Sequence, residues 1–402
     1  MTDPRSDPEP SPVGGEIRAD APRKSAPLLF LGHAADRTGP PIYLLHVLRW
    51  LRATHPEVEF EVALLMGGEL EDDFHELAFT TVGENLPVPP WSDAQREAVQ
   101  DQLRDQMSQH ADSRVVHING APCAEMARLL PPAERVLLSH VHELEIGLSH
   151  WMHPRDRRVL LEDADRIFVV ADAVGRNLVE NHGVDPAVLA LHPGMIDRRS
   201  IPEPPPPEER GEARRVRGIP WDGLVIGTSG TVYWRKAFDL FLQAAWRLDR
   251  RHRGERLSFV WVGGEQGAID HAMRLARSLG VEDMVYFVGN QPDPFNWFEL
   301  MDVFVLPARE DPFPLVCLEA LAVGVPVVAF DTGGMPELLD RGCGLVARYP
   351  DLHDLTGKID ALLVDPARRH ALGERGRELV TTDYDVSHLA PRLWADIERW
   401  LP

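Results

Sequence analysis

The chain has 402 residues, 44% of them apolar and 26% charged, so it is long enough for two domains with ample hydrophobic cores. Its formal net charge of −21 argues against a nucleic-acid-binding protein, because a phosphate backbone requires a Lys- and Arg-rich surface. The spacing of Cys123, Cys317 and Cys343 indicates neither a disulfide framework nor a zinc site. No secretory signal is visible, and we expect a cytoplasmic protein.

Residues 1–26 are rich in Pro, Asp and Arg, which predicts a disordered tail. Short apolar runs then alternate with helical stretches from Leu28–Gly32 to about residue 200. This alternation predicts a Rossmann-like domain over residues 27–200, with a parallel sheet covered on both faces. Its first helix, Ile42 to Arg52, carries Arg49 and Arg52, which suit peripheral contact with a membrane. Packing of this helix onto the sheet explains the same pattern equally well.

Residues 201–220 interrupt the alternation with Pro202 and the run Pro204–Pro207, which predicts a Pro-rich linker in the polyproline II conformation. Apolar runs resume at Leu224 and predict a second Rossmann-like domain over residues 221–387. Residues 388–402 have the apolar spacing of an amphipathic helix, which we expect to pack back on the first domain. The fold class is therefore α/β, with ligands bound beyond the carboxyl ends of the strands, in a cleft between the domains.

Two carboxylates follow the predicted strand Val303–Leu306. The run from Phe313 to Phe330 carries no charge except Glu319, and an unpaired charge is rarely buried completely. We therefore expect Glu319 to face a space that holds a polar ligand. Asp311 precedes it by eight positions, and together the two carboxylates are suited to bind the hydroxyl groups of a polyol.

The predicted helix start between these carboxylates suits a phosphate group. Pro314 fits the first helical position, so the free N–H groups of Leu315 and Val316 point out of the positive end of the helix. We count Phe313 with them as a donor-binding residue. Hydroxyl and phosphate ligands together suggest a sugar nucleotide. A buried helix whose single Glu is satisfied by water is the alternative explanation.

The second half of the chain resembles the retaining glycosyltransferases of family 4, which have the GT-B fold of two facing Rossmann-like domains. The resemblance rests on Asp311, seven intervening residues and Glu319, followed by the strand Gly324–Ala329 and the turn Gly333–Glu337. It implies that Asp311 contacts hydroxyls of the donor sugar and that Glu319 binds the ribose of the nucleotide.

Further segments extend the resemblance to most of residues 27–390. It implies that Lys236, with Arg235 beside it, neutralises the donor diphosphate. It also implies that Gly39 lies in a loop close to the donor phosphates and that His142 lines the acceptor side.

Four positions depart from the family pattern. Asp311 stands in place of the usual Glu, so Glu310 is a rival for its role. Pro314 and Ala237 replace glycines, and Gly230 stands where an arginine is common.

The activity implied by the resemblance is hexosyl transfer from a nucleotide diphosphate sugar, with retention at the anomeric carbon and without a metal ion or other cofactor. The acceptor, the donor base and sugar, and the oligomeric state stay open. Two alternatives remain. One is a GT-B epimerase or hydrolase that acts on the sugar nucleotide without transfer, and the other is a non-enzymatic sugar-nucleotide-binding or scaffold protein.

Overall fold

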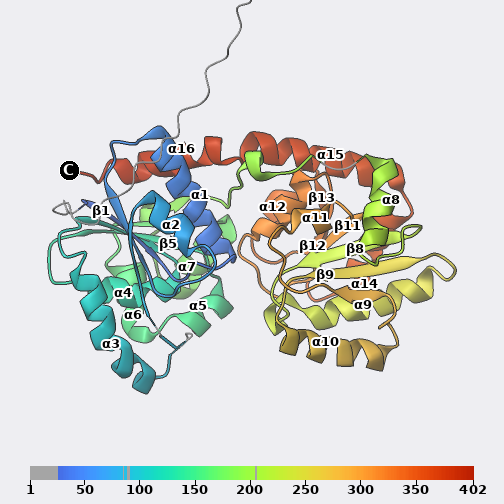
Figure 1. Ribbon diagram of the computed structural model, residues 1–402, viewed down its shortest axis with the longest axis horizontal. Coiled ribbons are helices and arrows are strands. Elements are labelled where there is room, and N and C mark those ends of the chain that lie inside the picture. The colour runs from blue at the N-terminus through green and yellow to red at the C-terminus, as the bar shows by residue number, and fades with distance from the viewer. Residues whose placement is uncertain (1–25, 85, 88–90, 204–205) are drawn as a thin grey trace, which may run out of the picture.

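The computed structural model describes residues 26–84, 86–87, 91–203 and 206–402, which form two α/β domains side by side (Figure 1). Each domain is built on one sheet whose paired strands are all parallel. Of the expected N-terminal tail, residues 1–25 lie outside the described residues.

The first domain has a seven-stranded sheet in the order β3-β2-β1-β4-β5-β6-β7. Its strands are β1 (Leu28–Gly32), β2 (Phe60–Leu64), β3 (Phe79–Val82), β4 (Val115–Asn119), β5 (Val136–Val141), β6 (Arg166–Val169) and β7 (Leu189–Leu191). Its helices are α1 (Gly39–Thr54), α2 (Glu71–Leu77), α3 (Asp93–Ser108), α4 (Ala124–Leu129), α5 (Glu145–Trp151), α6 (Pro154–Arg157) and α7 (Asp172–His182). Short helical turns are η1 (Ala121–Cys123), η2 (Arg158–Glu162), η3 (Pro186–Val188) and η4 (Arg198–Ser200).

The second domain has a six-stranded sheet in the order β10-β9-β8-β11-β12-β13. Its strands are β8 (Leu224–Ser229), β9 (Leu257–Val262), β10 (Val285–Phe287), β11 (Val303–Leu306), β12 (Val327–Phe330) and β13 (Gly344–Ala347). The helices from here to the C-terminus are α8 (Pro207–Val216), α9 (Phe238–Arg251), α10 (Gln266–Leu279), α11 (Phe295–Phe298), α12 (Leu315–Ala322), α13 (Met335–Leu339), α14 (Leu352–Leu363), α15 (Pro366–Asp383) and α16 (Val386–Glu398), with the turn η5 (Trp234–Lys236).

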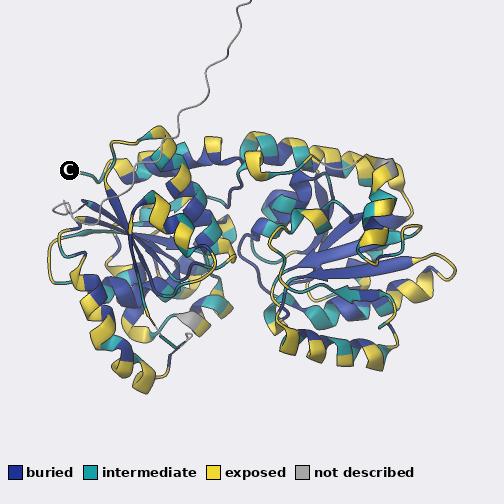
Figure 2. Ribbon diagram, viewed as in Figure 1, coloured by how far each residue is buried: buried dark blue, intermediate teal, exposed yellow. Residues whose placement is uncertain are grey.

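The central strands are buried on both faces. All five residues of β1 and all four of β11 are buried, and the sheets form the dark interior of both domains in Figure 2. Helices on both faces of a parallel sheet require such continuous apolar strands. The predicted strands Leu28–Gly32 and Val303–Leu306 have the same bounds in the structure.

Three strands escape prediction, namely β3, β7 and β13, and each lies at an edge of its sheet. Edge strands are short and covered on fewer sides, so their apolar signal is weak. In β3 two of the four residues are threonines, and β7 leaves Leu191 41% exposed.

The predicted polyproline linker is wrong over residues 207–216, which form α8. A proline fits the first turn of this helix, and the Glu, Arg and Ala residues that follow favour a helix. Arg214 fixes α8 to the second domain by donating to the backbone oxygens of Leu300 and Gly223 and to the Asp302 carboxylate, at 2.6–2.9 Å. Residues 204–205 lie outside the described residues.

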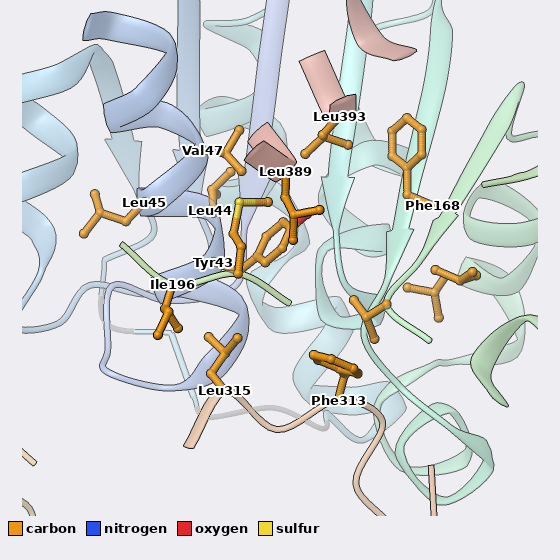
Figure 3. Packing of buried hydrophobic residues seen from close by; sticks show 14 of the residues in the cluster. Tyr43, Leu44, Leu45, Val47, Phe168, Ile196, Phe313, Leu315, Leu389 and Leu393 are labelled. Atoms are coloured by element: carbon orange, nitrogen blue, oxygen red, sulfur yellow. The ribbon is translucent and has the colours of Figure 1, made fainter. Parts of the chain in front are cut away.

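The C-terminal helices connect the two domains across one side of the molecule (Figure 1). α15 packs on α12 in the second domain, and α16 packs on α1 in the first. Leu389 and Leu393 of α16 lie close to Leu44 and Val47 of α1 in Figure 3. No helix within the described residues has the length and apolar character to cross a membrane.

The two arginines of α1 that suggested membrane contact are engaged within the first domain. Arg49 forms an ion pair with Asp73 of α2. Arg52 donates to the Leu77 backbone oxygen at 2.8 Å and lies over the Phe60 ring. Packing within the domain therefore accounts for both arginines, and the structure adds no support for a membrane surface here.

Candidate active site

The predicted site residues gather where the two sheets approach each other. Glu310 follows β11 and accepts hydrogen bonds from the backbone N–H groups of Ile146 and Gly147, at 2.9 and 3.0 Å, just after β5. Glu337 follows β12 and accepts from the N–H groups of Asp172 and Ala173, at 3.0 and 2.9 Å, just after β6. The carboxyl edges of the two parallel sheets therefore meet at the domain junction, where ligands of such sheets bind.

Lys236 and Asp311 form an ion pair on the second-domain side of this junction. The Lys236 Nζ donates to the Asp311 Oδ2 at 2.5 Å, and their side chains are 15% and 8% exposed. Lys236 ends η5, and the next residue, Ala237, has a left-handed φ of 58° although it is not glycine. Such a conformation costs about 1–2 kcal/mol for a non-glycine residue. Strain of this kind clusters at functional sites.

Glu310 and Asp311, the two candidates for the sugar-binding carboxylate, have different surroundings. Both carboxylate oxygens of Glu310 are occupied by backbone N–H groups of the first domain. Asp311 instead faces Lys236, the residue expected at the diphosphate. The geometry thus favours Asp311 as the sugar-binding carboxylate.

Glu319 lies on α12, is partly exposed and has no hydrogen-bond or ion-pair partner among the described residues. Burial raises its pKa to about 7, because the charged form loses hydration. A carboxylate without a protein partner retains its capacity to accept hydrogen bonds from a ligand. This agrees with the expectation that Glu319 faces a polar ligand.

The start of α12 differs from prediction by one residue. Pro314 is the N-cap residue in an extended conformation, and the helix begins at Leu315. The N–H of Cys317 bonds to the Pro314 oxygen at 3.1 Å, whereas no bond within the described residues engages the N–H groups of Leu315 and Val316. These two N–H groups are therefore available to a phosphate.

The Phe313 side chain packs between the domains, so the predicted role of Phe313 in donor binding stays a prediction for its backbone alone. Its ring stacks on Tyr384 at 5.7 Å between centroids, and together with Leu315 it leaves no room for a side chain at Gly194. Figure 3 shows Phe313 and Leu315 beneath the first-domain core near Ile196. An apolar ring in this position is stabilised by burial between the domains, so Phe313 is a packing residue.

Arg235 also points toward the domain junction. Its Nη1 donates to the Glu310 backbone oxygen at 2.8 Å. Its positive charge also counteracts the rise in the pKa of Glu143 across the junction, which burial brings to about 7. Arg235 therefore adds positive charge next to Lys236.

On the first-domain side, His142 follows the carboxyl end of β5 and is partly exposed. Its Nε2 lies 2.8 Å from the Asn119 Oδ1, and the Asn119 Nδ2 donates to the Pro40 oxygen at 3.0 Å. Because the amide oxygen can only accept, this orientation assigns the proton of His142 to Nε2 and leaves Nδ1 as an acceptor. Burial, reinforced by His117 and His33, lowers the pKa of His142 to about 3, so the ring is neutral. His140, by contrast, is completely buried.

Gly39 is the first residue of α1, and a side chain there would meet no atom within 4 Å. Because Pro40 and Pro41 have no N–H, Gly39 supplies the only backbone donor among the first three residues of this described helix. Its approach to the donor phosphates therefore stays a prediction, limited to a single N–H group.

No group of three or more His, Cys, Asp or Glu side chains in the described part of the chain is arranged to hold a metal ion. An open groove of about 450 Å³ lies away from the predicted residues, beside α7. It is lined mainly by Val169, Val179, Leu189 and Leu191.

The comparison with known proteins points to one family over the second half of the chain. The model of the glycosyl transferases group 1 matches residues 209–379, which include Lys236, Asp311 and Glu319. Over these residues the chain is similar to the glycosyl transferases group 1, in agreement with the expected resemblance.

The chain spans a little over half the length of the curated relatives that it matches. A D-inositol 3-phosphate glycosyltransferase of Kribbella flavida is 33% identical over 229 residues, which cover 54% of this chain and 53% of the relative. A second such enzyme, from Catenulispora acidiphila, is 34% identical over 256 residues, covering 60% and 58%.

Solved structures confirm the GT-B fold over nearly the whole chain. The Anabaena protein HepE in complex with UDP and glucose has a TM-score of 0.77 at 16% identity, covering 93% of this chain and 99% of that one. Sucrose-phosphate synthase from Thermosynechococcus elongatus has a TM-score of 0.76 at 18% identity, covering 92% and 98%. At such low identity the likeness shows the fold alone.

Two residues of the junction have contacts that sequence reasoning does not predict. The sequence indicates Glu337 only as part of a turn, and Glu310 only as a rival of Asp311. One further signal is present in the sequence: the residues before α5 and α7 are Leu144 and Ala171, whose side chains cannot cap a helix.

Proposed function

We propose that this protein moves a sugar from a nucleoside diphosphate sugar to a hydroxyl group of an acceptor. The observations that carry the proposal are the Lys236–Asp311 pair, the unpartnered Glu319 of α12 and the free N–H groups that begin α12. A cation, a helix N-terminus and two carboxylates match the diphosphate, ribose and sugar of one ligand. UDP-glucose is the first donor to test, because solved structures of HepE contain UDP, glucose or UDP-glucose.

In the proposed reaction, the bond between the anomeric carbon and the phosphate oxygen breaks as a bond to the acceptor oxygen forms on the same face. Because both bonds lie on the same face, the configuration is retained. The electron pair of the broken bond goes to the phosphate oxygen, so negative charge develops on the diphosphate, which takes up the acceptor proton. Lys236 and Arg235 stabilise that charge, and Asp311 holds the sugar hydroxyls. The neutral His142 Nδ1 accepts a hydrogen bond from the acceptor hydroxyl and orients it.

We further propose that transfer needs no metal ion, since Lys236 and Arg235 together can supply the positive charge that a diphosphate requires. The free cysteines Cys123, Cys317 and Cys343 are all buried, which supports a reducing cytoplasm as the compartment.

Lys236→Ala tests the diphosphate role. We expect affinity for UDP-glucose to fall at least tenfold while affinity for uridine stays within about twofold, because a single charge contact to phosphate contributes about 1.5–3 kcal/mol. Isothermal titration calorimetry, with and without a chelator, measures both ligands. Lys358→Ala, which changes a partly exposed lysine on α14, is the matched control.

Equal losses for UDP-glucose and uridine would contradict a phosphate role for Lys236. Free UDP released at the same rate with and without a sugar acceptor would favour the hydrolase alternative. Binding without turnover over a broad acceptor panel would favour a sugar-nucleotide-binding protein.

A further inference from the structure

Two helices of the first domain begin without a cap of their own. The N-cap residues of α5 and α7 are Leu144 and Ala171, and neither helix start has a side-chain cap. The first N–H groups of a helix have no partner within the helix. Helices α1, α2 and α4 also lack a side-chain cap, whereas Ser92, Asp351 and Asp385 cap α3, α14 and α16 locally.

The caps of α5 and α7 come from the other domain. The Glu337 Oε2 and Oε1 accept from Asp172 and Ala173 in the first turn of α7, at 3.0 and 2.9 Å. The Glu310 Oε2 and Oε1 accept in the same way from Ile146 and Gly147 in α5, at 2.9 and 3.0 Å. Each carboxylate uses both oxygens on successive N–H groups, and a negative charge is favourable at this end of a helix.

The backbones at these contacts are closely packed. A Cβ at Gly334, which precedes the helix of Glu337, would lie 2.9 Å from the Ala171 Cβ in the other domain. A Cβ at Gly147 would lie 3.0 Å from the Glu143 Cβ and 3.8 Å from the Glu310 Oε1. Gly334 therefore permits the close approach of the two domains at the Glu337 contact.

These contacts connect the residues proposed to bind the sugar donor with the residue proposed to bind the sugar acceptor. Glu310 is the neighbour of Asp311 in the chain, and its partner Ile146 follows His142 by four residues. A displacement of α5 from Glu310 therefore separates His142 from Asp311 and Lys236.

We propose that Glu310 and Glu337 are positioning residues that hold the two domains in the closed arrangement by capping α5 and α7. The contacts are reversible, because the Glu337 side chain is 26% exposed and water can replace it at the helix start. The consequence for catalysis rests on the proposed function, whereas the effect on domain arrangement does not.

The domain arrangement is tested by a distance between spin labels on the full chain. Ala98→Cys on α3 and Ser278→Cys on α10 place labels at exposed positions of the two domains, while the three native cysteines are buried (Figure 1). We expect a narrow distance distribution in the labelled parent and a broader, longer one when Glu310→Gln and Glu337→Gln are added. Glu282→Gln, which lies before the amino end of β10 and so away from the carboxyl ends of the strands, is the control. It should leave the distance distribution unchanged.

A second readout separates positioning from general damage. We expect the Glu310→Gln, Glu337→Gln protein to bind UDP within twofold of the parent, because all proposed nucleotide contacts except the single N–H of Gly39 lie on the second domain. Its kcat with a competent acceptor should fall at least tenfold, because fewer molecules are closed. An unchanged distance distribution in the folded double variant overturns the proposal. Changed distances without any UDP binding would retain the role of the two carboxylates in domain arrangement and overturn the proposed function instead.

Discussion

At the scale of single residues, the position of Asp311 depends on a glycine in the opposite turn. Gly333 has a left-handed φ of 59°, and a Cβ there would lie 1.8 Å from the Asp311 backbone oxygen. No side chain fits at that distance, so the Gly-Gly turn is required to hold Asp311 against Lys236. The family motif is thus explained by contact between its two parts.

Glu319 is the residue whose titration should be visible in ligand binding. Burial raises its pKa to about 7, from an ordinary value of 4.5. Because the folded protein retains this proton longer than the unfolded chain, the ligand-free protein loses stability as pH rises from about 4.5 to about 7. Ribose hydroxyls donate hydrogen bonds to a carboxylate. They therefore favour the ionised form of Glu319, which increases as the pH rises.

We therefore expect affinity for UDP-glucose to rise about tenfold between pH 6 and pH 8, as follows for a group with a pKa of about 7. The titration uses UDP-glucose rather than UDP, because the terminal phosphate of UDP itself takes up a proton near pH 6. Calorimetric titrations of the parent and of Glu319→Gln over this range measure the effect. Burial also raises the pKa of Glu143 to about 7. The effect of Glu319 is therefore the difference between the parent and Glu319→Gln in how affinity changes with pH. Parallel pH profiles would contradict ribose binding by Glu319.

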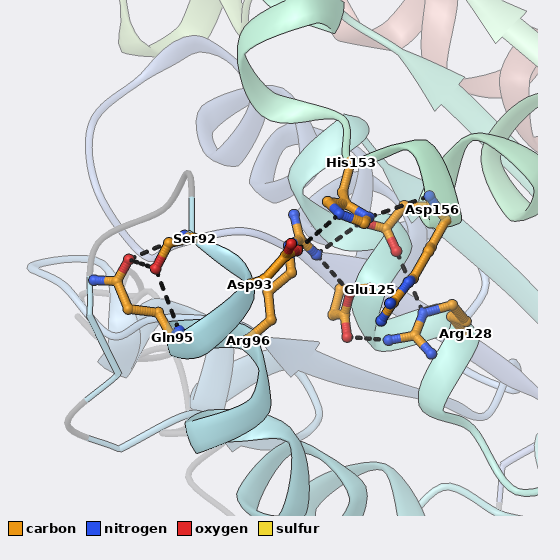
Figure 4. Close-up of polar contacts among 9 residues, drawn as sticks. Ser92, Asp93, Gln95, Arg96, Glu125, Arg128, His153 and Asp156 are labelled. Carbon is orange, nitrogen blue, oxygen red and sulfur yellow. Dashed lines mark hydrogen bonds and ion pairs between the residues drawn. The ribbon is translucent and has the colours of Figure 1, made fainter.

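At the scale of elements, buried charges fix helix α3 to its neighbours. Arg96 donates to the Glu125 and Asp156 carboxylates at 2.6 and 2.9 Å, and Arg128 pairs with the same two acids (Figure 4). The acid side chains are only 3–4% exposed, and burial is the main cause that raises the pKa of Asp156. Most residues of α3 are polar. These ion pairs, rather than an apolar face alone, therefore determine where the helix packs.

Arg96→Ala should lower the free energy of unfolding by about 3–5 kcal/mol, because it leaves two buried carboxylates with one arginine. Arg104→Ala removes an arginine from the same helix, but its partner Asp101 is 95% exposed. That control should change stability by less than about 0.5 kcal/mol. Urea unfolding followed by circular dichroism measures both, and similar midpoints for the two variants would contradict the role of the buried network.

At the scale of the whole molecule, the chain crosses between the domains twice, and the crossings pair with each other. The Ile196 N–H donates to the Tyr384 oxygen at 3.0 Å, and the Val386 N–H donates to the Ile196 oxygen at 2.9 Å. Asp385 caps α16 through the Ser387 N–H and also accepts from the Arg198 N–H at 2.9 Å. One buried carboxylate therefore stabilises both crossings.

Asp385→Ala should lower stability by about 2–3 kcal/mol, since it removes a helix cap and leaves the Arg198 N–H without its partner. Asp365→Ala is the matched control, because Asp365 caps α15 through the local N–H of Arg368. Its cost should be about 1 kcal/mol. Scanning calorimetry compares the variants, and equal losses would mean that Asp385 acts as a helix cap alone.

Local patterns in the sequence were sufficient to predict the two α/β domains and to place Asp311 and Glu319 after the strand Val303–Leu306, whereas Lys236 came from the family resemblance. Those features depend on apolar alternation and on motif spacing, which are properties of short stretches of chain. Prediction failed at three of the four edge strands and at α8, because a short strand and a polar helix acquire their stability from neighbours that are distant in sequence.

Contacts between distant parts of the chain were needed to choose between Glu310 and Asp311, to assign the proton of His142 and to place Phe313 in the core. Glu310 and Glu337 act on residues that are 163–165 positions away, on another domain. No local pattern encodes a partner at that distance, because its position depends on how two independently formed sheets approach each other.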